Sequence, residues 1–539
     1  MRAFRLVSLV VLVACGADHE PPARPTSHID RSAAARPTET LVEVSLEGGD
    51  AALATLIAKL PPDPLRAGLP SRIAMLLDGL IDTPPEIRAH VASTSPLRLL
   101  MMRVDGETRS AVAVRLDARL PPTAHAGDGP RGSDRVGERC AVDEQIAVVT
   151  DDPVMLERAF AYLAYTALPR ASTEGSIVLS VPAATLATTL RAALERSVSD
   201  ERASLMESIA AARTAHARPP DLGDPEALVT LLADAALARI AYLPDLGDAS
   251  VTLSPTASGL ALDADASVTA ASPLALALAD YAPISPTFVS AMPSSSALVI
   301  AAGTTPAART RSGRELGETL AAIAGDRLGA AEHVALDDAS RAITALSGDA
   351  RSIALGASDA NFAFAILLTR GGTEAAAPTP WGRLFPWTSA LLGALIDCTP
   401  VSPRATSSLA SICGDVALAT QIAEGTRADA IGRDAAALAD AARRGLASDA
   451  AATSPDLARD LLALPSSTSA LAIVRPLRAL PLLSLLFGAL RPGLPRGDGA
   501  IVLALAPAAT SVRLTLRASS AGLADLAAVI DLFSQRDDE

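Results

Sequence analysis

Four cysteines are the residues with the most distinctive chemistry in this chain, because a thiol can carry a lipid, form a disulfide or bind a metal. Cys15 follows a short N-terminal stretch in which Arg2 and Arg5 precede an almost wholly apolar run. That run has about nine residues, which suits a signal-peptide core and is too short to span a bilayer. The pattern predicts that the chain is exported.

The residues Leu12 to Cys15 read Leu-Val-Ala-Cys and resemble the lipobox of bacterial lipoproteins. The resemblance implies that signal peptidase II removes residues 1–14 and that diacylglycerol is attached to the thiol of Cys15. Gly16, rather than an aspartate, follows the cysteine, which in lipoproteins of Gram-negative envelopes implies transport to the outer membrane. We therefore expect a protein of the bacterial cell envelope whose first partner is the lipid bilayer, through acylated Cys15. The alternative is an ordinary secretory leader with an incidental cysteine.

Residues 15–40 combine this cysteine with prolines, alanines and mixed charges that show no periodicity. Such a composition predicts a disordered tether that is semi-extended where the prolines cluster. We expect the tether to lift the body of the protein away from the lipid surface.

The remaining cysteines are Cys140, Cys398 and Cys413. In an oxidising envelope Cys398 and Cys413 are the natural disulfide pair, because only a short segment with prolines and serines separates them. Closing a loop of about 15 residues would contribute about 3 kcal/mol of stability in the chain-entropy model. Pairing of Cys140 with either of the other two is the alternative, and otherwise Cys140 is left over.

The sequence contains none of the common motifs for catalysis or cofactor binding. Cys-x-x-Cys, His-Glu-x-x-His and Gly-x-Ser-x-Gly are all absent. The stretch from Gly127 to Gly132 has the letters of a dinucleotide fingerprint, but a polar loop continues where that fingerprint needs a helix. We therefore predict a protein that is not an enzyme, with no catalytic, cofactor-binding or metal-binding residue.

Composition narrows the choice of partners. The formal net charge is -14 and no basic stripe interrupts it, so a phosphate backbone would be repelled and nucleic acid is a poor candidate partner. Half of the residues are hydrophobic but only 3% are aromatic, so the cores must consist mainly of aliphatic side chains. Stacking platforms for bases or sugars would be scarce.

From residue 41 onward one order of elements recurs four times: a strand, one or more helices, and a two-stranded hairpin. The clearest hairpin turns at Asp105-Gly106, which is a strong short-range signal between alternating runs. The four units open with strands at residues 42–46, 176–181, 296–301 and 469–474. The last strand of the fourth unit alternates apolar residues (Val512, Leu514, Leu516) with polar ones (Arg513, Thr515, Arg517). We expect its apolar set to face the core and its polar set to face solvent.

A further strand and helix follow Cys140 between the first two units and follow Cys413 between the last two. This parallel indicates a tandem duplication, with lobes at residues 41–275 and 291–539. Alternating strands together with helices predict mainly antiparallel sheets, each covered by helices on one side, which is the α+β class. In architecture the body is similar to large secreted bacterial proteins of uncharacterised function built from duplicated α+β lobes, and that resemblance implies no activity.

The most hydrophobic stretch after the leader spans residues 479–490. It is too short to cross a bilayer and predicts a buried helix, with a helix lining a lipid-accepting groove as the alternative. We predict an envelope lipoprotein that binds a hydrophobic or lipid ligand, or an envelope protein. The alternatives are a scaffold or assembly lipoprotein that acts by protein contact and, third, an envelope hydrolase without a recognisable motif.

Overall fold

The computed structural model describes the chain in segments. The described residues are 31–60, 72–120, 127–130, 133–170, 175–214, 225–284, 287–290, 292–324, 334, 337, 350–356, 364–370, 409–413, 416–423, 426–447, 454–480 and 497–534. The chain divides into two compact units: unit 1 contains residues 1–185, 247–266 and 530–539, and unit 2 contains residues 186–246 and 267–529. This division groups residues 186–246 with the second half, unlike the predicted lobes 41–275 and 291–539. The two-lobe division is therefore not confirmed and stays a prediction.

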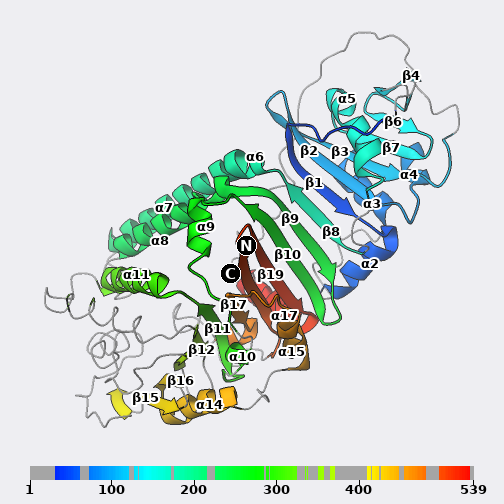
Figure 1. Cartoon of the computed structure of the whole chain (residues 1–539). Coiled ribbons are helices and arrows are strands. Elements are labelled where there is room, and N and C mark those ends of the chain that lie inside the picture. Colours follow the sequence, from blue (N-terminus) through cyan, green and yellow to red (C-terminus); the bar gives the residue numbers. More distant parts are fainter. Residues whose placement is uncertain are drawn as a thin grey trace. The chain divides into compact units, whose positions relative to one another are not determined.

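Unit 1 is built on an antiparallel sheet (Figure 1). Its strands are β1 (Thr40–Leu46), β2 (Leu97–Val104), β3 (Glu107–Arg115), β4 (Gly127–Asp128), β5 (Asp134–Arg135), β6 (Cys140–Asp143), β7 (Ile146–Thr150), β8 (Ile177–Val181), β9 (Leu246–Pro255) and β10 (Gly259–Val268). Hydrogen-bonded neighbours follow the order β4-β5-β6-β7-β3-β2-β1-β8-β9-β10. The ends of β9 and β10 belong to unit 2.

The predicted hairpin between β2 and β3 is confirmed. Val104 pairs with Glu107, so Asp105 and Gly106 form a two-residue turn. Both turn residues have positive φ, 52° for Asp105 and 87° for Gly106. Turns of this kind match the twist of the flanking strands, which explains why Asp-Gly directs the hairpin locally.

The helices of unit 1 are α2 (Gly49–Lys59), α3 (Ile73–Leu80), α4 (Pro85–His90), α5 (Pro153–Tyr162) with the π-helical turn η3 (Leu163–Ala167), and α6 (Ala183–Thr185). The Asp152 carboxylate accepts hydrogen bonds from the amides of Val154 and Met155, and Pro153 occupies the first helical position, so α5 begins where its residues predict. α5 packs on β2, β3, β6 and β7. Both faces of β3 are nevertheless buried. The prediction that the sheet is covered on one side only is therefore wrong for this strand.

The strands of unit 2 also pair antiparallel with one another (Figure 1). Its strands are β11 (Ser296–Gly303), β12 (Ala350–Gly356), β13 (Phe364–Arg370), β14 (Leu409–Cys413), β15 (Val416–Ala423), β16 (Thr426–Gly432), β17 (Ala470–Val474), β18 (Ile501–Ala508) and β19 (Ser511–Ser519). Hydrogen-bonded neighbours follow the order β14-β15-β16-β13-β12-β11-β17-β18-β19.

The helices that follow α6 along the chain belong mainly to unit 2. They are the π-helical turn η4 (Leu186–Leu190), α7 (Arg191–Thr214), α8 (Pro225–Ile240), the short η5 (Leu243–Asp245), α9 (Pro273–Leu278), α10 (Thr287–Ser290), α11 (Pro306–Ala324), α14 (Ala435–Ala447), α15 (Pro455–Leu462) and α17 (Ser520–Ser534). α7 packs against α8, and α14 packs on β13, β15 and β16. Helices therefore cover part of this sheet, as an α+β fold requires.

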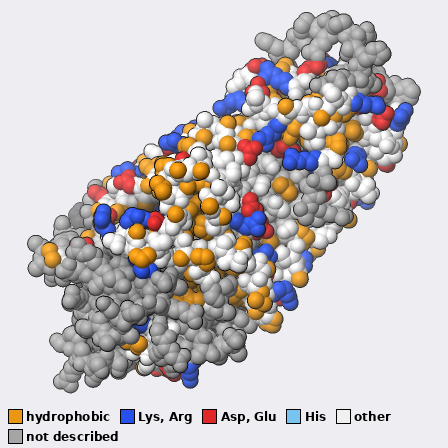
Figure 2. Space-filling view, in the orientation of Figure 1, with side chains coloured by type: hydrophobic (Ala, Val, Ile, Leu, Met, Phe, Trp, Pro, Cys, Tyr) orange, Lys and Arg blue, Asp and Glu red, His pale blue; other side chains and the backbone are white. Residues whose placement is uncertain are grey.

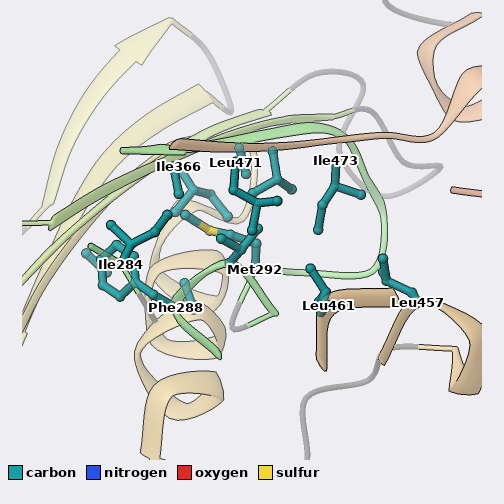
Figure 3. Packing of buried hydrophobic residues seen from close by; sticks show 14 of the residues in the cluster. Ile284, Phe288, Met292, Ile366, Leu457, Leu461, Leu471 and Ile473 are labelled. Atoms are coloured by element: carbon teal, nitrogen blue, oxygen red, sulfur yellow. The ribbon is translucent and has the colours of Figure 1, made fainter. Parts of the chain in front are cut away.

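The main hydrophobic core of unit 2 lies on one face of its sheet (Figure 3). Ile366, Leu471 and Ile473 project from the strands toward Phe288 of α10 and Leu461 of α15. Most of the remaining core positions on the strands and on α14 are alanines, which fits the small share of aromatic residues.

The two units share a strand order. Unit 1 contains the run β6-β7-β3-β2-β1-β8-β9-β10, and unit 2 contains the run β15-β16-β13-β12-β11-β17-β18-β19, in which each strand occupies the equivalent place along the chain. Each unit also places a helix, α5 or α14, directly after β7 or β16. The α+β class with antiparallel sheets is thus confirmed. The common ancestry of the two halves stays a hypothesis, which this recurrence favours.

Candidate ligand-binding face

The residues predicted to carry chemistry are only partly within the described ranges. Cys15 and Cys398 lie outside them, so lipidation of Cys15 and a disulfide from Cys398 stay predictions. Cys413 ends β14, and no disulfide occurs among the residues that the structure describes, so the pairing has no support from it. Cys140 is a free thiol in β6 and is 1% exposed. Burial raises its pKa to about 12, so this thiol is protonated and unreactive at neutral pH.

Within the described ranges, no group of three or more His, Cys, Asp or Glu side chains lies close enough to hold a metal ion. None of the helices in those ranges is both long enough and apolar enough to cross a membrane.

Residues 31–40, the last part of the predicted tether, are ordered and begin with contacts to unit 1, so the disorder predicted for residues 15–40 does not extend to them. The Arg31 guanidinium donates to both carboxylate oxygens of Asp143 at the end of β6, at 2.7 and 2.8 Å. The hydroxyl of Tyr165 donates to the same carboxylate at 2.9 Å. Three residues further on, the amide of Ala34 donates to the Thr166 hydroxyl, which in turn donates to the Ala34 carbonyl. Residues 31–34 therefore form a strap on η3 and β6.

The charge state of Asp143, which holds the strap, is well defined. Burial alone would raise the pKa of Asp143, but the hydrogen bonds from Arg31 and Tyr165 and the positive charges of Arg31 and Arg119 together hold it below its ordinary value. Asp143 is therefore ionised throughout the neutral range. About 16 residues separate Cys15 from Arg31, which limits the reach of the tether to about 55 Å when fully extended.

One face of the central strands of unit 2 carries aliphatic side chains on every strand. Residues directly opposite each other in an antiparallel pair lie on the same face. Ile300 on β11 is opposite Ile353 on β12 and Ala472 on β17. The same row continues through Leu503 on β18 to Leu516 on β19.

Two neighbouring rows on this face are also aliphatic. One row contains Leu355, Leu298, Val474 and Ile501, and the other contains Ala302, Ala470, Leu505 and Leu514. We call these three rows the apolar face. Ile300 and Ile353 are 46% exposed, and Leu355, Leu503 and Leu514 are 38% exposed. A contiguous group of large exposed aliphatic side chains is a candidate binding surface, because exposed hydrophobic residues are normally scattered singly.

The opposite face of the same strands forms the hydrophobic core. Val299, Leu471 and Ile473 alternate with the exposed set along β11 and β17 and are almost fully buried. These strands are thus apolar on both faces, whereas a sheet with one solvated face normally alternates apolar with polar residues.

The predicted orientation of β19 was wrong. Thr515, expected to face solvent, is 1% exposed, whereas Leu514, expected in the core, is among the exposed residues of the apolar face. The register explains the reversal, because Thr515 lies opposite the core residue Ala504 and Leu514 lies opposite Leu505. Which residues of β19 face the core is thus set by its register with β18 rather than by the polarity of β19 alone.

The apolar face ends on one side in a buried ion pair. Its first row continues past β12 to Leu367 on β13, Asp429 on β16 and Thr420 on β15. The Thr420 hydroxyl donates to Asp429 at 2.5 Å, and Arg427 donates to both carboxylate oxygens of Asp429 at 2.7 and 3.1 Å. Neither the apolar face nor this pair was predicted from the sequence. The one available signal was that the segments around Ile300, Ala472 and Leu503 are continuously apolar rather than alternating.

Comparison of the chain with protein-family models, curated proteins and solved structures finds no match. The fold and its surfaces are thus the basis for any functional assignment.

Proposed function

We propose that the protein is a lipid-anchored protein of the bacterial envelope that binds the acyl chains of a lipid on the apolar face of unit 2. The observation that carries this proposal is the set of three aliphatic rows, exposed on one face of a sheet whose other face is the core. The anchor part of the proposal rests on the resemblance of Leu12 to Cys15 to a lipobox.

The chemistry of the face favours acyl chains over a protein partner. The residues named in its three rows are all Ala, Val, Ile or Leu, with no aromatic side chain, and the third row reaches Arg351 at its β12 end. The cores of protein interfaces are enriched in Tyr, Trp, Met and Arg, which supply both area and hydrogen bonds. An aliphatic surface without hydrogen-bonding side chains matches a hydrocarbon chain, which needs none.

The expected binding energy is substantial. Full burial of an Ile or Leu side chain contributes about 2 kcal/mol, so covering one that is nearly half exposed contributes about 1 kcal/mol. Five such side chains lie on the face. Together they would supply about 5 kcal/mol before the entropic cost of ordering the ligand.

The test uses the full chain without its leader and with Cys15→Ser, so that no attached lipid interferes. Binding of a fluorescent long-chain fatty acyl probe is measured for this protein and for the same protein with Ile300→Glu. We expect the glutamate to weaken binding about tenfold or more, because covering it would require desolvation of a carboxylate. Leu462→Glu is the matched control, since Leu462 is exposed at the end of α15 and away from the apolar face. Equal affinities for all three proteins would refute the proposal.

The anchor is tested separately. Cells fed a labelled fatty acid should incorporate the label into the wild-type chain and not into Cys15→Ser. An unlabelled wild-type chain would remove the anchor from the proposal while leaving acyl binding by the apolar face open to its own test.

A protein partner is the second candidate, and a different surface favours it. Hydrophobic side chains gather around α9 in Figure 2, where Leu276 is strongly exposed. Leu232 on α8 is also exposed. If native mass spectrometry of the protein from the envelope found a stoichiometric protein that Leu276→Glu releases and Ile300→Glu does not, the scaffold function would replace lipid binding.

A further inference from the structure

Arg427 has an unused hydrogen-bonding group. Its Nε and Nη2 atoms donate to Asp429, but its Nη1 atom is buried and has no hydrogen-bond partner. The side chain is 9% exposed. A buried donor without a partner is unfavourable, so a group that accepts from Nη1 would be bound with a gain in free energy.

The position of this donor links it to the apolar face. Arg427 lies in the row that continues through Thr369 on β13 and Arg351 on β12 to Ala302 on the apolar face. Arg427 and Arg351 are two strands apart, which is about 10 Å in a sheet. Arg427 thus lies at one end of an aliphatic surface.

Solvent is close to this end. Ile422 on β15 lies directly opposite Arg427 and is exposed. The buried guanidinium is therefore one strand away from an open part of the same sheet face.

We propose that the ligand of the apolar face is an amphiphile with an anionic headgroup, a carboxylate or a phosphate, which accepts a hydrogen bond from Arg427 Nη1. This inference rests on the proposed function and specifies the chemistry of its ligand. The hydrocarbon chain lies across the aliphatic rows, and the headgroup lies toward β16. Arginine suits this role because its fixed fork can bind Asp429 with two donors and present a third to an oxyanion.

The experiment compares two ligands with the same chain. Palmitate carries a carboxylate and 1-hexadecanol does not, so the ratio of their dissociation constants isolates the headgroup. We expect the Cys15→Ser protein to bind palmitate about tenfold or more tighter, the usual gain for a hydrogen bond to a charged group. Removing Arg427 alone would leave Asp429 buried and unpaired, so the variant is Arg427→Met with Asp429→Asn. This variant should bind both ligands equally and keep the wild-type affinity for hexadecanol.

The outcomes separate the two proposals. If the Cys15→Ser protein binds both ligands equally, the anionic headgroup is refuted and acyl binding stands. If it binds neither, the proposed function itself fails. Inorganic phosphate serves as a third ligand: displacement of palmitate by phosphate at comparable concentration would indicate a small-anion site and overturn the amphiphile. Arg475→Gln is the matched control, because Arg475 is a buried arginine of the same unit that donates to the Ser296 carbonyl. The Arg475→Gln protein should keep the preference for palmitate over hexadecanol.

Discussion

Replacing Arg98 by Met should destabilise unit 1 more than any surface change. Arg98 lies on β2 and is 2% exposed, on the face that α5 covers. Its guanidinium donates to the carbonyls of Ala167 at 2.9 Å and Arg170 at 2.6 Å, at the C-terminal end of η3, and it pairs with Glu47. A positive charge at this end also interacts favourably with the partial negative charge at the C-terminal end of the helical turns.

The magnitude follows from what the substitution leaves behind. Methionine fills much of the volume, so the hydrophobic packing is largely kept. The carbonyls of Ala167 and Arg170 and the carboxylate of Glu47 lose their shared donor. Removing one partner of a buried ion pair typically costs about 3–5 kcal/mol, and we expect Arg98→Met to fall in that range.

Adding Glu47→Gln should restore part of the loss, because no uncompensated carboxylate then remains. A coupling energy above about 1 kcal/mol between the two substitutions is expected for groups in direct contact. The readout is hydrogen exchange of the α5 amides, since a chain with two units need not unfold in a single step. A loss below about 1 kcal/mol for Arg98→Met, or simple additivity in the double variant, would refute this account.

Four further predictions concern unit 1. Asp143→Asn should accelerate trypsin cleavage after Arg31 severalfold, because that arginine loses its charged two-oxygen partner and keeps its exposed pair with Glu144, whereas Asp78→Asn, which breaks an exposed pair elsewhere, should not. The pKa of Asp143 is lower in the folded state than its ordinary value of about 3.9. The Arg31–Asp143 ion pair should therefore be fully formed above about pH 3.9 and be lost as the pH falls through the folded pKa. Faster hydrogen exchange of residues 31–34 already at about pH 6 would contradict this pH dependence. Cys140 should react with a maleimide at pH 7.5 only after denaturation, as measured by mass, and rapid labelling of the native protein would disprove its burial. Asp152→Ala should cost about 1 kcal/mol through loss of the α5 cap, seen as faster exchange of the first-turn amides, and unchanged exchange would show that the cap is dispensable.

Trypsin suits the strap experiment because of the residues around it. Arg24 and Arg36 are each followed by proline, which blocks cleavage, whereas Arg31 is followed by Ser32. Within residues 15–40 the bond after Arg31 is therefore the one susceptible site. The assay reports the state of a single clamp.

Much of the local structure could be predicted from the sequence. Asp105-Gly106 specifies its own turn, because few other residue pairs tolerate two positive φ angles. Asp152 and Pro153 define the start of α5, because the cap and the first helical position act on adjacent backbone groups. The order of strand, helices and hairpin follows from the period of the apolar residues, which is a property of each segment alone.

The candidate site depended on contacts between distant segments. Leu514 and Thr515 exchange their expected places because β18 sets the register of β19. In the sequence Arg427 and Asp429 are simply two charged residues separated by one alanine. Only the pairing between strands places them at the end of an aliphatic surface. No local pattern distinguishes these charges from solvated ones.

The sequence by itself determined the turns, the helix caps and the succession of strands and helices, because each depends on neighbours a few residues apart. The tertiary structure alone decided which face of a doubly apolar strand becomes core and which stays exposed, as it does for Val299 and Ile300 on β11. The physical reason is that both faces bear the same kind of side chain, so the choice belongs to the helices and strands that pack against the sheet.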